Sequence, residues 1–211
     1  MGLKCSIGEV ANRIQASELQ DKGVLANCHV NVLQTQDHPQ FKTYAEELKW
    51  LTTDTTRMSW IANTIKDIAT SGNTLILVDR ISAGELLEKK IKDSVFVSGS
   101  TKNMDRKEQY DEISTATNKV IIATYGVAAV GINIPRIFNL VLIEPGKSFV
   151  RVIQSIGRGI RKAEDKDSVQ IWDITSSCKF AKRHLGARKK FYKEANYPYN
   201  IEKINYENPY T

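Results

Sequence analysis

The sequence is poor in the residues that build disulfide frameworks and metal sites. It has three cysteines and three histidines in 211 residues, and Cys5, Cys28 and Cys178 lie far apart without a CxxC spacing or a matching histidine pattern. These spacings indicate neither a set of disulfides nor a zinc site. The low use of cysteine is typical of proteins from reducing compartments.

Long apolar stretches are missing as well. No segment approaches the roughly 20 apolar residues that a membrane-spanning helix needs, and the start from Met1 to Cys5 lacks the apolar core of a secretory signal. We therefore expect no membrane partner and a cytoplasmic location.

The residues that are present suit a globular core with a basic surface. Hydrophobic residues make up 41% of the chain, which is enough for one sizeable domain, alone or with an appendage. Lysine and arginine number 30 against 24 acidic residues, which leaves a net charge of +6. This excess suits a nucleic-acid partner but does not require one.

From residue 72 to residue 176, short apolar runs alternate with helical patterns, which indicates a central domain. The runs predict strands at Thr74–Val78, Ser94–Val97, Val120–Thr124, Asn139–Ile143 and Val169–Ile174. Strands that are apolar almost throughout and are separated by helices indicate a parallel sheet covered on both faces. Such sheets bind ligands at the carboxyl ends of their strands, where we expect Gly99, Thr124 and Asp173 to lie.

Residues 1–71 precede this domain as an entry segment with one strand and two helices. Alternation of polar and apolar residues predicts a half-buried strand at His29–Thr35, and helical spacing predicts helices at 41–51 and 56–71. The patterns leave open whether this segment joins the sheet or forms an insertion.

Residues 177–211 are predicted to form a basic helix and a tail. From Cys178 to Ala195 the pattern is helical, aromatic residues are interleaved with basic ones, and no acidic residue occurs before Glu194. Such a helix could lie along a phosphate backbone, although a solvated basic face explains it equally well. The side chains that would contact the backbone include Lys182, Arg183, Lys189 and Lys190.

An amide and two guanidinium groups share one stripe of the helix expected between the last two strands. Gln154, Arg158 and Arg161 recur at positions i, i+4 and i+7, while isoleucines form a separate apolar face. Because a guanidinium fork is suited to a carboxylate or a phosphate, the stripe predicts an anion site. The alternative is a structural ion pair with an acid such as Asp173 or Glu164.

These residues resemble the motifs of superfamily 2 helicases. Residues 154–161 match the QxxGRxxR pattern of motif VI, residues 123–135 look like motif V, and residues 75–80 look like motif IV. In overall pattern the chain is most similar to the carboxyl-terminal halves of phage UvsW-type recombination and repair helicases. The resemblance implies an α/β fold of the RecA-like (P-loop NTPase-like) type, a parallel sheet sandwiched by helices, without a phosphate loop of its own.

Two motifs of that family are missing from the sequence. The 211 residues contain neither a GxxxxGK[ST] phosphate loop nor a DExH or DEAD box, with which such helicases hold ATP and Mg²⁺. We therefore expect the chain to be the second half of a motor, whose N-terminal RecA-like domain binds most of the ATP and Mg²⁺. We also expect negligible ATPase activity from this chain alone.

The resemblance implies a role for each residue of the predicted anion site. Arg161 would be the arginine finger at the γ-phosphate, with Arg158 beside it on the phosphates and Gln154 orienting both. Gly131 and Asn133 would approach the nucleotide ribose, with Asn133 standing where many relatives have aspartate.

The resemblance also implies a nucleic-acid track along the carboxyl edge of the sheet. Phosphates of the tracking strand would be held there by Arg80, Ser98, Gly99 and Thr124. For Arg80, Ser98 and Thr124, a purely structural role at a strand end is an equal alternative, such as a cap on the following turn for Thr124.

The expected function is the carboxyl-terminal half of an ATP-dependent DNA helicase or translocase. Its expected substrate is branched DNA in recombination, repair or replication, in the host cytoplasm if a phage encodes the chain. Two alternatives stay open, namely an RNA helicase half and a non-catalytic nucleic-acid-binding module of the same fold. The motifs discriminate poorly between DNA and RNA, because backbone contacts carry no base identity.

Overall fold

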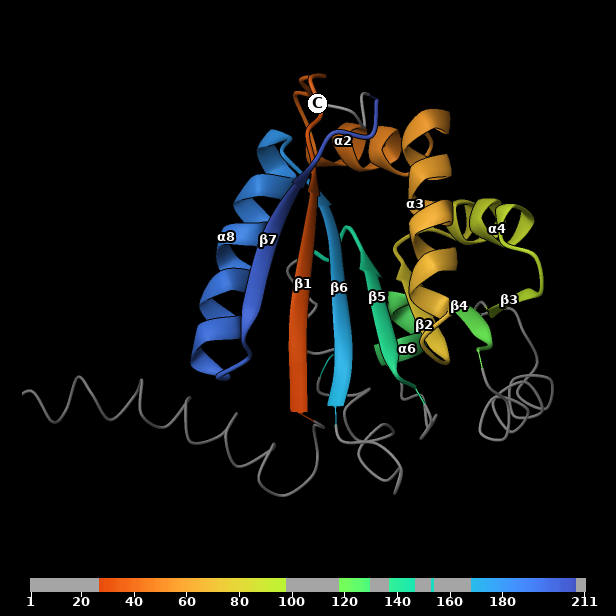
Figure 1. Ribbon diagram of the computed structural model, residues 1–211. Helices are drawn as coiled ribbons and strands as arrows, with labels where there is room; N and C mark the ends of the chain where they lie inside the picture. Colours follow the sequence, from red (N-terminus) through yellow and green to blue (C-terminus); the bar gives the residue numbers. More distant parts are fainter. Residues whose placement is uncertain (1–26, 98–117, 130–136, 147–152, 154–167, 208–211) are drawn as a thin grey trace, which may run out of the picture.

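A parallel sheet of seven strands forms the centre of the described structure (Figure 1). The computed structural model describes residues 27–97, 118–129, 137–146, 153 and 168–207. The strand order is β3-β4-β2-β5-β6-β1-β7, and every neighbouring pair is parallel. The strands are β1 (Asn27–Thr35), β2 (Thr74–Val78), β3 (Ser94–Val97), β4 (Val120–Thr124), β5 (Asn139–Ile143), β6 (Ser168–Ser176) and β7 (Tyr199–Ile204). The predicted parallel α/β sheet is confirmed.

Helices cover both faces of this sheet, as Figure 1 shows. They are α2 (Tyr44–Leu51), α3 (Thr55–Ala69), α4 (Ile81–Lys90), α6 (Tyr125–Ala129) and α8 (Lys179–Glu194). One core layer joins the sheet to α3 and α4, and a second layer joins its other face to α6 and α8. Because both faces are covered, all five residues of β2 and of β5 are buried.

The helices predicted at 41–51, 56–71 and 178–195 are confirmed, with small changes at their ends. Two of them begin where a polar side chain accepts a backbone N–H of the first turn. Thr43 caps α2 through the N–H of Glu46, and Asp54 caps α3 through the N–H of Arg57. None of the helices described is long and apolar enough to cross a membrane.

The entry segment joins the sheet through β1, a point that the sequence patterns left open. Strand β1 lies between β6 and β7, with Val30 opposite Ile171 on one side and opposite Tyr199 on the other. The entry segment therefore contributes a strand to the same sheet as residues 72–176, and the tail contributes β7. Our sequence analysis predicted no strand at β7, because the middle four residues of this edge strand are exposed and form no apolar run.

A fully buried arginine on α3 joins the carboxyl ends of three strands. The Nε of Arg57 donates to Thr35 at the end of β1 (3.1 Å), and one Nη donates to Glu144 just after β5 (2.5 Å). Glu144 in turn accepts from the Thr175 hydroxyl of β6 (3.3 Å). The other Nη of Arg57 donates to the carbonyl oxygen of Leu51 on α2. These partners offset the large cost of burying a guanidinium charge.

Glu144, the counter-ion of Arg57, has an unusual environment and backbone conformation. It is 5% exposed, and its φ of 46° lies in the left-handed region that side-chain-bearing residues seldom adopt. Burial raises the pKa of Glu144 to about 7, although the attraction of Arg57 and Arg188 acts in the opposite direction. Between its ordinary pKa of 4.5 and about 7, the unfolded chain therefore releases this proton while the folded chain keeps it.

A glutamate on α2 caps the amino terminus of α8. This helix begins after Cys178, whose side chain makes no capping hydrogen bond. Instead, the carboxylate of Glu47 accepts the N–H groups of Phe180 (3.0 Å) and Ala181 (2.8 Å). Glu47 is buried, and its charge suits the positive end of the helix dipole. This contact fixes α2 against the start of α8.

We expect Glu47→Ala to lower the free energy of unfolding by about 2–4 kcal/mol, because one buried and one partly buried N–H group of α8 lose a charged acceptor. Urea denaturation measures the loss. Glu46→Ala is the matched control, since Glu46 is the exposed neighbour in the same helix, and its effect should stay within about 0.5 kcal/mol. Equal effects of the two substitutions would contradict the capping role of Glu47.

We expect Glu144 to make the protein less stable as the pH rises from about 5 to about 7, because the folded state there binds more protons than the unfolded state. Its contribution to the slope is at most about 1.4 kcal/mol per pH unit. Glu144→Gln should remove this contribution, whereas Glu85→Gln, at an exposed position of α4, should leave it in place. Urea denaturation at several pH values gives the slopes. A slope that is the same in the Glu144→Gln variant and the parent chain would refute the assignment.

Candidate functional site

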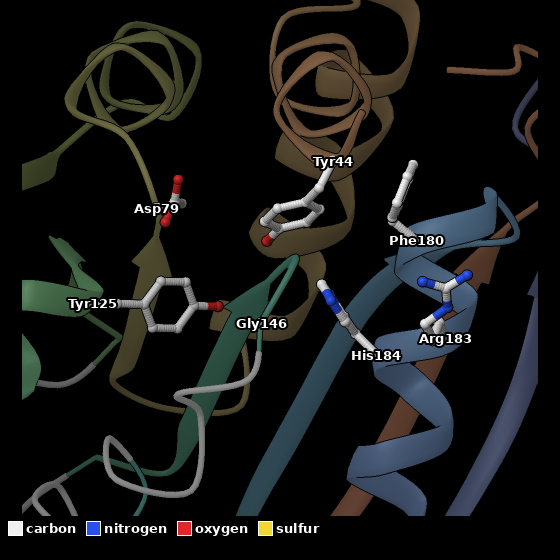
Figure 2. Close-up of a pocket in the computed structure, with 7 residues that line it drawn as sticks. All are labelled: Tyr44, Asp79, Tyr125, Gly146, Phe180, Arg183 and His184. Atoms are coloured by element: carbon white, nitrogen blue, oxygen red, sulfur yellow. The ribbon is translucent and has the colours of Figure 1, made fainter. Parts of the chain in front are cut away.

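An open cavity lies at the carboxyl edge of the sheet, where β2, β4 and β5 end (Figure 2). Its volume is about 540 Å³, within the usual range of small-ligand sites. The lining residues come from α2, from the loops after β2 and β5, from the start of α6 and from the first turns of α8. They are Tyr44, Asp79, Tyr125, Gly146, Phe180, Arg183 and His184. The sequence predicts ligand binding at this edge, and the cavity lies there.

Aromatic rings and cations from α2 and α8 form one wall of the cavity. The ring of Tyr44 meets that of His184 nearly at right angles, with centroids 4.8 Å apart, and lies 6.3 Å from that of Phe180. Two cations flank Phe180, since Arg183 Cζ is 5.7 Å and Lys179 Nζ 5.4 Å from its ring centroid. Rings and guanidinium groups arranged in this way are suited to planar or anionic ligands.

The opposite wall consists of a fixed tyrosine and an exposed carboxylate. The Tyr125 hydroxyl donates to the carbonyl oxygen of Ile143 (2.9 Å), which holds its ring across the end of β5. Desolvation raises the pKa of Tyr125 well above 10 and also raises that of Tyr44, so both phenols are neutral at physiological pH. The carboxylate of Asp79 lies 3.9 Å from Arg80 Nε, and both side chains are partly exposed.

Two of the predicted nucleic-acid contacts lie on neighbouring strand ends. Val78 of β2 is in register with Thr124 of β4, and Arg80 follows β2 as the residue that precedes α4. The hydroxyl of Thr124 accepts the N–H of Val127 (3.3 Å), so it does cap the following turn. The side chain of Arg80 is partly exposed and makes no capping hydrogen bond. Contact of either residue with nucleic acid stays a prediction.

Three of the four α8 residues predicted to contact a phosphate backbone are exposed, but another basic residue of this helix is turned inward. Lys182, Arg183 and Lys190 are exposed and Lys189 is half-buried. Arg188, in contrast, is buried and makes two hydrogen bonds to Asp173 of β6, at 2.8 and 2.9 Å.

Asp173 does not lie at the ligand-binding edge, where the sequence predicted it. It is fully buried beneath α8 and does not line the cavity. One oxygen also accepts from the hydroxyl of Tyr192 (2.8 Å). Both oxygens are therefore already used, which weakens the alternative that Asp173 forms an ion pair with Arg158 or Arg161.

The other candidate residues lie outside the described part of the chain. They are Ser98, Gly99, Gly131, Asn133, Gln154, Arg158 and Arg161. One neighbour is described, since Ile153 is 3% exposed and belongs to the core layer that also holds α8 residues. Its burial agrees with the apolar isoleucine face predicted for this segment. The described residues contain no cluster of three or more metal-ligating side chains.

Several cavity residues were not predicted from the sequence. The interleaving of Phe180 and His184 with basic residues on α8 was a usable signal, but the sequence explained it equally well by a nucleic-acid contact and by a solvated basic helix. Tyr44 had only a helical spacing that indicated a packed face, and Tyr125 and Asp79 had no signal apart from following a strand. The fold brings these side chains together from four separate elements.

Comparisons with known proteins agree with this fold. The model of the helicase conserved C-terminal domain matches residues 56–163, about half of the chain. The ATP-dependent DNA helicase UvsW of Enterobacteria phage T4 is 28% identical over 195 residues, which cover 87% of this chain and 39% of that protein. The chain thus spans less than half the length of this relative.

Solved structures show the same fold. The crystal structure of T4 UvsW superimposes with a TM-score of 0.74 at 22% identity, over 85% of this chain and 42% of that chain. The E. coli DEAD-box protein SrmB gives a TM-score of 0.59 at 17% identity, over 88% of this chain and 96% of that chain. The parallel sheet is therefore of the RecA-like type found in helicase carboxyl-terminal domains. The chain belongs to the family of helicase conserved C-terminal domains and is a second RecA-like domain of the superfamily 2 helicases, similar to phage UvsW.

Proposed function

We propose that this chain is the carboxyl-terminal motor half of an ATP-dependent DNA helicase or translocase. It would pair with an N-terminal RecA-like domain, and ATP hydrolysis between the two would move the protein along DNA. Branched DNA in recombination, repair or replication is the proposed substrate, in the cytoplasm of the cell where the protein acts. The relative named as a DNA helicase supports DNA over RNA.

The placement of cationic and polar groups along one edge is the observation that carries this proposal. Arg80 and Thr124 follow adjacent strands at the carboxyl edge of the sheet. Helix α8 starts at the same cavity, since Arg183 of its first turns lines it. A phosphate backbone that follows this edge would meet one partly exposed arginine and then the cations of α8. Ser98 and Gly99 would add contacts after β3.

The ATP side of the proposal rests on the motif residues in the family match. Arg161 would stabilise the charge that develops on the γ-phosphoryl oxygens, Arg158 would contact the phosphates, and Gln154 would orient both. Gly131 and Asn133 would approach the ribose. ATP and Mg²⁺ would be held mainly by the partner domain, which supplies the phosphate loop and the acidic box that this sequence lacks.

We expect Arg161→Ala to abolish most DNA-stimulated ATP hydrolysis when this chain is joined to a RecA-like domain with a phosphate loop. Loss of an arginine finger should lower kcat by about 10³–10⁵-fold and leave nucleotide binding largely intact. Lys66→Ala, at an exposed position of α3, is the control and should keep full activity. Unchanged turnover in Arg161→Ala would rule out the finger assignment. ATP hydrolysis by this chain alone at a comparable rate would rule out the motor-half proposal.

We expect single-stranded DNA binding by the chain to weaken steeply with salt. Neutralising Lys189 and Lys190 together to glutamine should reduce the slope of log K against log[salt] by about 0.7 per lost phosphate contact. The matched control neutralises Lys66 and Lys89, which are exposed on α3 and α4 at the other face of the sheet. Fluorescence anisotropy over a salt series gives both slopes. If both double variants behave like the parent chain, α8 is a solvated face.

A further inference from the structure

We propose that the cavity between α2 and the first turns of α8 holds one unpaired base of a bound single strand. The base would stack on the ring of Tyr44, with the rings of Phe180 and His184 at its edges, and Arg183 would contact the adjoining phosphate. This inference rests on the proposed function and adds a contact with the base itself to a track that otherwise contacts only the backbone.

The first support is the exposure of the rings. Tyr44, the first residue of α2, is 37% exposed. Its contact with His184 is edge to face, at an interplanar angle of 75°. In an edge-to-face pair, the ring that presents its edge keeps both of its own faces uncovered by its partner. Figure 2 shows the two side chains reaching into the cavity from α2 and α8. The cavity therefore offers an aromatic face to a planar ligand.

The second support is the polarity of the cavity. Arg183 and Lys179 lie beside the ring of Phe180, whereas Asp79 lies across the cavity from Arg183 (Figure 2). A phosphate would be attracted to the cationic side and repelled by the carboxylate. The carboxylate can instead accept hydrogen bonds from the amino or ring N–H groups of a base edge. Charge thus directs the phosphate to Arg183 and the base toward Asp79.

The third support is that the amino terminus of α8 cannot serve as the phosphate site. The N–H groups of Phe180 and Ala181 already donate to Glu47, so that carboxylate occupies the place an anion would take. The cations that remain for a phosphate are side chains on the outer surface of α8, next to the rings. A nucleotide unit fits this combination, because stacking and a guanidinium contact are both used by proteins that bind single strands. The volume of about 540 Å³ also accommodates a base with its sugar.

The experiment compares two probes with the same backbone charge, a single-stranded oligo(dA) and an abasic oligomer of equal length. The 211-residue chain should bind oligo(dA) about 5- to 150-fold more tightly, the effect of stacking one base. Tyr44→Leu should remove this preference, and Tyr44→Phe, which keeps the ring, should retain it. Phe180→Leu is a second variant that tests the same cavity from α8. Phe41→Leu is the control, because Phe41 packs on Trp50 and does not line the cavity.

The outcomes distinguish a failure of this proposal alone from a failure of the proposed function. If the Lys189/Lys190 double variant loses affinity for both probes equally while Tyr44→Leu loses only the preference for bases, both proposals are supported. Equal affinity of the parent chain for the two probes would overturn the stacking site and leave the backbone track intact. A preference that persists in both Tyr44→Leu and Phe180→Leu would overturn it as well. No binding of either probe would contradict the track and the stacking site together.

Discussion

The buried guanidinium of Arg57 is the constraint on which the carboxyl edge of the sheet depends. It is fully buried on α3 and contacts the ends of α2, β1 and β5, while its counter-ion Glu144 reaches β6. Removing one partner would leave an unpaired charge in the interior, which costs far more than the loss of a surface ion pair. The loops that bear the site therefore begin from strand ends whose relative positions are fixed by charge. Glu144 keeps its left-handed backbone conformation within this network.

The walls of the cavity are held by the same kind of contact. Glu47 fixes α2 to the start of α8, and Arg188 fixes the middle of α8 to β6 through Asp173. As a result, Tyr44 and the ring side chains of α8 are placed by polar bonds to the backbone and to buried acids. Because these side chains are already ordered in the free protein, less binding energy is lost in ordering them when a ligand binds. The exposed cations of α8 lie outside this frame, where salt screens them.

The sequence was sufficient for most strands of the sheet and insufficient for the cavity. The roles assigned to the motif residues stay predictions. Apolar runs such as Thr74–Val78 identify buried strands, because both faces of a parallel sheet are covered. The placement of β1 beside β6 and the existence of β7 depend on pairing between distant segments, which local patterns do not encode. The burial of Arg188 was not predicted either, because its neighbours in α8 are basic and mostly exposed. Tyr44 lies at the site because α2 packs against a helix more than a hundred residues later, a contact to which Glu47 contributes.

The position of β1 has a consequence for how the domain is made. Its partner residues in β6 follow about 140 positions later in the chain, and those in β7 follow later still. During synthesis, β1 has neither neighbour until β6 and β7, more than a hundred residues later in the sequence, have also been made. Its unpaired backbone is then a template for incorrect strand pairing. Such long-range pairing also slows folding, because a large loop must close before its contacts form. Residues 168–204 therefore complete the sheet as well as carrying the basic helix.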